Sequence, residues 1–200
     1  MNIVAFGDSI TEGRTGVLPE QNWLLLLGKK LGPTFNLFNA GVGGNSAREA
    51  MARYERDVLA HHPDLVLLEF GGNNHDPHPE RVARRVSDQE FTSLLRIFRD
   101  GLPSGCQVIM MTFPPIISEQ HCYFKLVPDG KVDEELNPQR QIVRDFAAAQ
   151  GWPLLDLYRL MYPRRHELIL PDGVHLNPAG HVFLAEQVLL MLKNMGVTRE

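Results

Sequence analysis

The chain has 200 residues, 44% of them apolar, with 20 basic and 24 acidic side chains and a net charge of -4. This length and composition predict one globular domain over residues 1–200. The balanced charge offers no concentrated positive field, so we expect no nucleic acid partner. The apolar runs are shorter than the roughly 20 residues that cross a bilayer, and no export signal is evident. We therefore expect no membrane insertion, a cytoplasmic location and two reduced cysteines.

Short apolar runs alternate with longer amphipathic segments along the chain. The runs predict buried strands at residues 2–6, 35–39, 65–70, 107–112 and 153–157. In the longer segments apolar residues return every three or four positions, which predicts helices at 21–31, 46–60, 87–100, 134–150 and 178–194. Strands that alternate with helical crossovers indicate a parallel sheet covered on both faces, which is an α/β sandwich.

Two stretches, 71–86 and 113–133, fit neither pattern and are expected to be long loops. Long loops in a compact domain are often part of a functional site. In the second loop Phe113, Pro114 and Tyr123 are apolar or aromatic. They are candidates for the wall of a substrate pocket, although ordinary packing beneath the loop would explain them equally well.

Small polar residues and glycines follow the predicted strands, at the edge where an open parallel sheet binds its ligands. They occupy residues 7–9, 39–45 and 71–74. Near the end of the chain, Asp172 and His175 precede an asparagine and a proline, which are typical of a helix start.

These residues supply what acyl transfer requires. A serine hydroxyl at Ser9 needs a base, and His175 can serve if Asp172 fixes the tautomer and orientation of its imidazole. The negative oxygen that forms on the attacked carbonyl needs fixed hydrogen-bond donors. The backbone N–H groups of Ser9 and Gly44 and the side-chain amide of Asn73 are the candidates for this oxyanion hole.

The sequence closely resembles the SGNH hydrolases, also called the GDSL esterase and lipase family. The first family block is matched by GDSIT at 7–11, and the blocks follow in the family's order between positions 3 and 181. The other matching positions are Asn39, Gly41 and Gly44, then Gly71 and Asn73, and finally Asp172 and His175. One departure is Asn74, where the family usually has aspartate.

The resemblance implies a flavodoxin-like, three-layer α/β/α sandwich with a five-stranded parallel sheet. It also implies ester hydrolysis through an acyl-serine intermediate, with no metal or other cofactor. We therefore expect a serine esterase acting on small carboxylic esters, such as short acyl or acetyl esters. The acyl and alcohol specificity, the oligomeric state and the effect of Asn74 stay open.

Other interpretations of the same residues compete with this one. The sequence GVGGNS at 41–46 approximates a dinucleotide-binding loop, with Glu69 as a ribose-binding acid, and an inert carbohydrate-binding module would keep the fold without the chemistry. Ser9 could merely cap a short helix. His75 is a candidate for lining the cleft beside Asn73. It is close to Asp76 and His78 in the sequence, but no further ligands stand out, so we expect no metal site.

Overall fold

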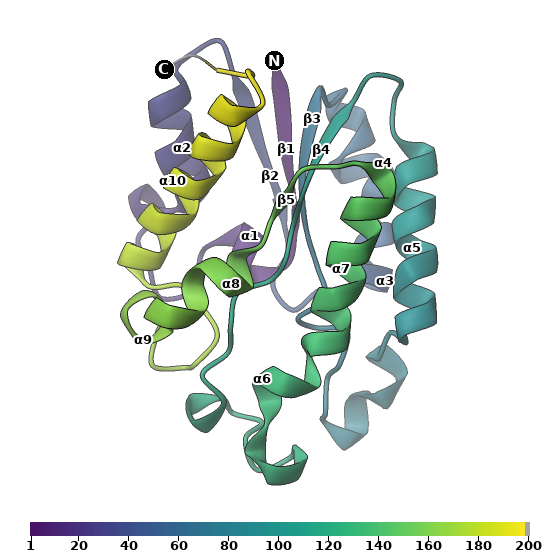
Figure 1. The fold of residues 1–200 in the computed structure, drawn as a ribbon, viewed down its shortest axis with the longest axis vertical. Coiled ribbons are helices and arrows are strands. Elements are labelled where there is room, and N and C mark those ends of the chain that lie inside the picture. Colours follow the sequence, from purple (N-terminus) through teal and green to yellow (C-terminus); the bar gives the residue numbers. More distant parts are fainter. Residues whose placement is uncertain (199–200) are drawn as a thin grey trace.

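Five parallel strands form the central sheet, in the order β2-β1-β3-β4-β5 (Figure 1). The computed structural model describes residues 1–198. The strands are β1 (Asn2–Gly7), β2 (Asn36–Gly41), β3 (Leu65–Glu69), β4 (Gln107–Met111) and β5 (Leu154–Leu155). The predicted five-stranded, flavodoxin-like sandwich is confirmed. Only β5 is much shorter than expected, because the side chain of Asp156 accepts the backbone N–H of Arg159 and starts a helix.

Side chains alternate between two cores on the two faces of the sheet. In β1, Ile3 and Ala5 belong to one core, whereas Val4 and Phe6 belong to the other. Helices α2 (Trp23–Leu31) and α10 (Pro178–Asn194) cover the first face. The second face is covered by α3 (Ala47–Met51), α4 (Tyr54–Asp57), α5 (Asp88–Gly101) and α7 (Asn137–Gln150). The central strands β1 and β3 are buried on both faces and read as continuous apolar runs, whereas the edge strand β2 is partly exposed.

The single helix expected at 46–60 is wrong. The structure divides this segment into α3, α4 and the 3-10 turn η2 (Leu59–His61), with the first break at Arg53. The Arg53 guanidinium donates to the carbonyls of Gly7 and Ala40, at the ends of β1 and β2. This tie to the sheet fixes Arg53 outside helical geometry, with φ -115° and ψ 5°.

The helix expected at 134–150 is also divided. It consists of α6 (Val132–Glu135) and α7, separated at Leu136. Pro138 lies in the first turn of α7, where its missing N–H costs no hydrogen bond. Two short helices were not predicted: α8 (Leu157–Met161) and α9 (Arg165–Leu168). The short helix α1 (Ser9–Glu12), considered as one that Ser9 could cap, is capped by Asp8.

The two expected loops are irregular for most of their length. They contain only the 3-10 turns η3 (Pro79–Arg84), η4 (Ser118–Gln120) and η5 (Pro128–Gly130), and the start of α6. A further two 3-10 turns, η1 (Pro19–Gln21) and η6 (Tyr162–Arg164), lie outside these loops. Cys106 and Cys122 are both free thiols.

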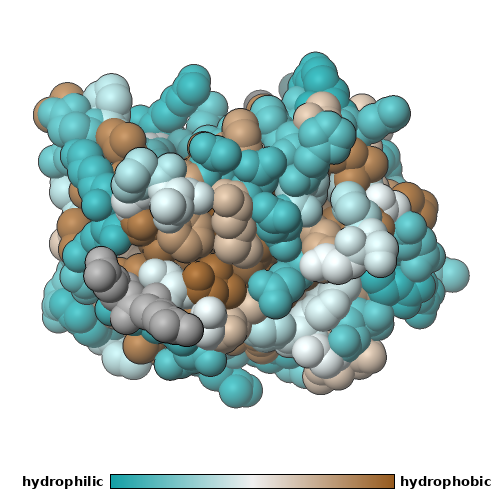
Figure 2. Space-filling view, turned by 90° about the horizontal axis from the view of Figure 1, so that it is seen from above, coloured by the Kyte–Doolittle hydropathy of each residue, from teal (hydrophilic) through white to brown (hydrophobic). Residues whose placement is uncertain are grey.

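The carboxyl ends of the strands point downward in Figure 1, toward α1 and, below it, α6. The chain termini lie at the opposite end, which Figure 2 views directly and which shows a hydrophobic area within a hydrophilic rim. The strand order reverses between β1 and β3, and this point is where open α/β sheets bind ligands. Among residues 1–198, none of the helices is long and apolar enough to span a membrane.

Candidate active site

Ser9 begins the short helix α1 directly after β1. The helix is capped by Asp8, whose Oδ1 accepts the backbone N–H of Ile10 at 3.0 Å. Capping is therefore the role of Asp8, and the Ser9 hydroxyl is left for another partner. The turn is tight at Gly7, where a Cβ would lie 1.9 Å from the Oγ1 of Thr11. Only glycine permits this approach of β1 to α1.

Asp172 and His175 lie in a closed turn between α9 and α10. An antiparallel bridge joins Ile169 to Leu176, and the N–H of Leu170 donates to the carbonyl of His175 at 2.7 Å. Asn177 then caps α10, with Pro178 at its first position, as the sequence predicts. The turn therefore holds the carboxylate and the imidazole in a fixed relation to each other.

The structure brings Ser9, His175 and Asp172 into one hydrogen-bonded chain. His175 Nδ1 lies 2.7 Å from Asp172 Oδ2, and His175 Nε2 lies 3.1 Å from Ser9 Oγ. Although partial burial opposes ionisation, the backbone N–H groups of Val174 and His175 and the imidazole hold the pKa of Asp172 below its ordinary value. An ionised Asp172 only accepts, so Nδ1 carries the hydrogen and Nε2 is free to accept from the serine hydroxyl.

The three candidate oxyanion donors line the same cavity. Ser9, Gly44 and Asn73 all border it, and they follow β1, β2 and β3 respectively. Gly44 has a φ of 74°, a conformation that favours glycine. Asn73 Nδ2 donates to Asp8 Oδ2 at 2.9 Å, so the amide is anchored beside the nucleophile.

This cavity has a volume of about 370 Å³, within the range of small-molecule sites. All four predicted substrate-binding residues line it: His75, Phe113, Pro114 and Tyr123. The sequence analysis missed part of the apolar wall, namely Val127, Val132 and Leu136, and it named no role for His121, which also lines the cavity. Val132 and Leu136 are four residues apart, and this spacing was the only signal in the sequence that they share a face.

A buried arginine holds the apolar wall in place. Arg140 is fully buried, and its Nη2 donates to Asp133 Oδ1 at 2.6 Å and to the carbonyl of Pro114 at 3.1 Å. Asp133 Oδ1 also accepts the N–H of Ile116, and the guanidinium lies 4.3 Å from the centre of the Phe113 ring. One ion pair thus joins helix α7, helix α6 and the loop that follows β4.

Asn74, the departure from the family pattern, is fully buried and hydrogen-bonded at both ends of its amide. Its Oδ1 accepts the N–H of Ala47 at 2.9 Å, at the start of α3, and its Nδ2 donates to Gln139 Oε1 at 2.7 Å. Gln139 Nε2 in turn donates to Asp88. The asparagine therefore supports the third loop through a chain of amides, and the neighbouring Asn73 keeps its place in the cavity.

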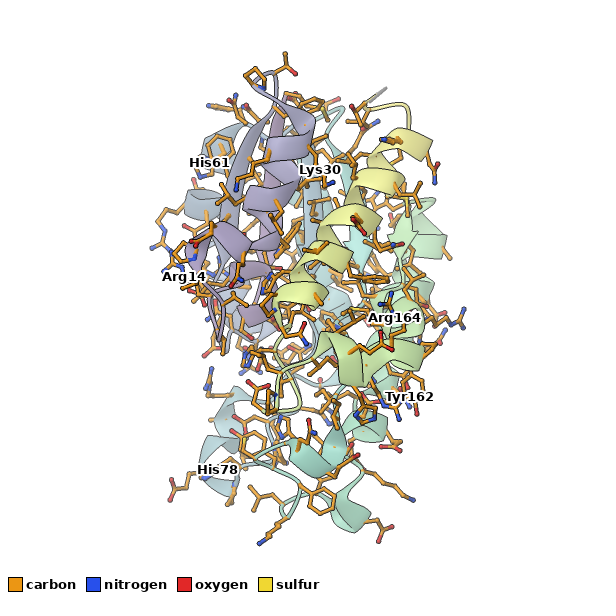
Figure 3. All side chains as sticks on the ribbon, turned by 90° about the vertical axis from the view of Figure 1, so that its left-hand side faces the viewer. Arg14, Lys30, His61, His78, Tyr162 and Arg164 are labelled. Carbon is orange, nitrogen blue, oxygen red and sulfur yellow. The ribbon has the colours of Figure 1, made fainter. Side chains whose placement is uncertain are left out.

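The geometry disagrees with the dinucleotide-binding interpretation. The GVGGNS loop follows β2, whereas the dinucleotide fingerprint follows the first strand, and Glu69 is fully buried with no surface left for a ribose. Asp76 Oδ1 accepts the N–H of His78, and His78 Nδ1 accepts the N–H of Glu80. Within residues 1–198 no group of three or more His, Cys, Asp or Glu side chains is placed to hold a metal ion. Figure 3 shows His78 at the lower end of the molecule, far from His61.

Comparisons with known proteins point to one family. The model of the GDSL-like lipase/acylhydrolase family matches residues 5–183. YqeF of Bacillus subtilis, an uncharacterized lipoprotein, is 27% identical over 205 residues, which cover 90% of this chain and 84% of YqeF. An isoamyl acetate-hydrolyzing esterase 1 homolog of Mus musculus is 29% identical, covering 91% of this chain and 77% of that protein. The solved structure of the acetyl xylan esterase AlAXEase superposes with a TM-score of 0.78 at 25% identity, covering 96% of this chain and 100% of that chain.

Proposed function

This chain belongs to the GDSL-like lipase/acylhydrolase family, and from that premise we propose that it is a serine esterase that hydrolyses small carboxylic esters. The observation that carries the proposal is the continuous chain from Asp172 through His175 to Ser9, with contacts of 2.7 and 3.1 Å. Both distances are within hydrogen-bond reach of a proton transfer.

In the proposed mechanism Ser9 Oγ attacks the ester carbonyl while His175 Nε2 takes the hydroxyl proton. Asp172 stabilises the imidazolium that forms. The N–H groups of Ser9 and Gly44 and the amide of Asn73 bind the oxyanion of the tetrahedral intermediate. His175 then gives the proton to the leaving alcohol, and a water molecule, activated by the same imidazole, releases the acid from the acyl-serine.

The proposed substrates carry a short acyl or acetyl group. The mouse relative is named for isoamyl acetate, and the superposed enzyme is named an acetyl xylan esterase. The apolar wall that includes Phe113 and Pro114 is suited to an acyl chain, whereas His75 and Tyr123 are suited to a polar alcohol. We propose that these four residues bind the substrate.

The remaining predictions from composition are kept as parts of this proposal. Residues 1–200 would act as one domain, without a nucleic acid partner or a cofactor. A cytoplasmic location stays a prediction from the sequence, and the lipoprotein name of YqeF makes it worth testing by cell fractionation.

Active-site labelling tests the proposed nucleophile. A fluorophosphonate probe should label the wild-type protein and the Ser93→Ala control, whose serine lies on α5, but not Ser9→Ala. Turnover should fall by about 10⁴-fold or more in Ser9→Ala and by about 10²- to 10³-fold in Asn73→Ala, with the fold intact. A nucleotide-binding protein or an inert carbohydrate-binding module would stay unlabelled. Undiminished activity in Ser9→Ala would refute the mechanism.

A substrate panel tests the proposed specificity. p-Nitrophenyl esters of increasing acyl length, alongside acetylated sugars, should give the highest kcat/KM for acetyl and other short acyl groups. Rising kcat/KM up to long-chain esters would assign the protein to lipid substrates and contradict this part of the proposal.

A further inference from the structure

Two buried carboxyl groups lie side by side beneath the proposed oxyanion hole. Asp8 precedes Ser9, and Glu69 ends β3, opposite Gly7 in the register of β1 and β3. Asp8 is 2% exposed and Glu69 is 0% exposed. Two carboxylates buried next to each other repel, which favours a form in which one of the two carboxyl groups keeps a proton.

The hydrogen bonds of Asp8 identify it as the ionised member of the pair. Its Oδ1 accepts from the N–H of Ile10 at 3.0 Å, and its Oδ2 accepts from Asn73 Nδ2 at 2.9 Å. Both of these partners are donors. A carboxylate, which only accepts, satisfies both contacts.

The surroundings of Glu69 are suited to a protonated acid. Its Oε2 accepts from Thr11 Oγ1 at 3.3 Å, whereas its Oε1 finds no donor among the described residues. A buried carboxylate oxygen without a donor is costly, but the hydroxyl of a carboxylic acid needs an acceptor, and Asp8 supplies one. Burial and the adjacent charge of Asp8 raise the pKa of Glu69 well above its ordinary value.

We propose that Glu69 stays protonated and, by donating its hydrogen bond to Asp8, is a positioning residue for the oxyanion donor Asn73. The inference rests on the proposed function, because it assigns Asn73 to the oxyanion hole. The two ends of an asparagine amide have nearly the same shape, so the partner decides which end faces it. An ionised Asp8 selects Nδ2, and the second hydrogen of that nitrogen then remains for the substrate oxyanion.

Without the proton of Glu69, Asp8 would be a buried carboxylate with one donor fewer. It would take up a proton more readily, and a protonated Asp8 could donate to the oxygen end of Asn73. The amide would then present the wrong atom to the substrate. Glu69 therefore acts on the reaction through Asp8 and Asn73, without touching the substrate.

Three single variants test this role. Glu69→Leu removes the donor, Glu69→Gln replaces it with an amide N–H, and Thr11→Val removes the other hydrogen bond of Glu69 as a matched control. We expect Glu69→Leu to lower kcat by about 10- to 100-fold with KM within about twofold of wild type. Glu69→Gln and Thr11→Val should stay within about threefold of the wild-type kcat. An equal fall in the glutamine and leucine variants, or no fall in either, would overturn the proposal.

A double-mutant cycle shows whether the effect passes through Asn73. In the Asn73→Ala background, adding Glu69→Leu should lower kcat by no more than about twofold, because the amide that Glu69 positions is already gone. A full additional loss of about 10-fold or more would mean that Glu69 acts by another route, against the proposal.

Infrared spectroscopy reads the proton directly and needs no activity. The difference spectrum between wild type and Glu69→Gln at neutral pH should contain the C=O band of a protonated carboxyl group. Its absence would overturn the proposal, even if Glu69→Leu failed to fold. A wild-type protein that the fluorophosphonate probe does not label at Ser9 would instead refute the proposed function. The failure of the role of Glu69 and the failure of the proposed function are therefore distinguishable.

Discussion

Burial of His181 makes the free energy of unfolding depend on pH, and one substitution at this position can isolate the effect. It lies in the first turns of α10 and is 2% exposed, and its Nδ1 accepts the backbone N–H of Trp23 at 3.2 Å. Burial lowers the pKa of His181 from 6.5 to about 4. Protonation would also turn Nδ1 into a donor that faces another donor.

The sign and size of the effect follow from proton linkage. Between about pH 4 and 6.5 the unfolded chain binds a proton at His181 and the folded chain does not, so the free energy of unfolding decreases as the pH falls. At 1.36 kcal/mol for each pKa unit, the shift from 6.5 to about 4 corresponds to about 3 kcal/mol. This stabilisation is complete above pH 6.5 and is lost by about pH 4.

Urea denaturation of wild type and His181→Asn, in steps across this pH range, measures the effect. The asparagine oxygen can accept the Trp23 N–H but cannot titrate. The free energy of unfolding of the variant should therefore approach that of wild type as the pH falls. His166→Asn, at an exposed histidine of α9, is the control and should keep the wild-type slope. Parallel pH curves for wild type and His181→Asn would refute the reasoning.

The buried polar groups around the cavity lead to two more predictions. Arg140→Met should lower the free energy of unfolding by about 3 to 5 kcal/mol in urea denaturation, because it leaves Asp133 buried without its charge partner. Adding Asp133→Asn should recover part of the loss. An Arg140→Met variant as stable as wild type would contradict the role of the ion pair. Asn74→Asp should lower the free energy of unfolding by about 1 to 3 kcal/mol. A carboxylate oxygen would then face Gln139 Oε1 and force the Gln139 amide to turn its nitrogen away from Asp88. Adding Asp88→Asn to Asn74→Asp should restore stability, since an amide in place of the Asp88 carboxylate can donate to the turned Gln139, and equal stability of the single and double variants would count against the proposed chain of amides.

The sequence predicts the sheet well because each strand is recognised locally. Runs such as 2–6 and 65–70 are buried on both faces, and this burial needs no information from elsewhere in the chain. The break at Arg53 could not be predicted in the same way. Its cause is a pair of carbonyls on two strands, and only the folded sheet brings these within reach of the guanidinium.

The candidate site also contains residues with a local sequence signal and residues that only tertiary contacts bring into place. Ser9, Asn73 and His175 could be located because they follow predicted strands or precede a recognisable helix start, and such positions meet at one edge of a parallel sheet. Val132 could not be assigned to the apolar wall, because it comes together with Ile116 through the ion pair between Asp133 and Arg140. Asp156, which ends β5 early, did carry a local signal, since an aspartate after a strand is a common helix cap.

The closed turn between α9 and α10 has a consequence for how the site responds to movement. Because Asp172 and His175 share this turn, a displacement of the segment carries the acid and the base along together and keeps their 2.7 Å contact. Ser9 belongs to a different element, so the 3.1 Å separation of its hydroxyl from the imidazole is the adjustable dimension. Movement of this turn relative to α1 would thus make or break the hydrogen bond between Ser9 and His175, while Asp172 keeps the imidazole correctly oriented.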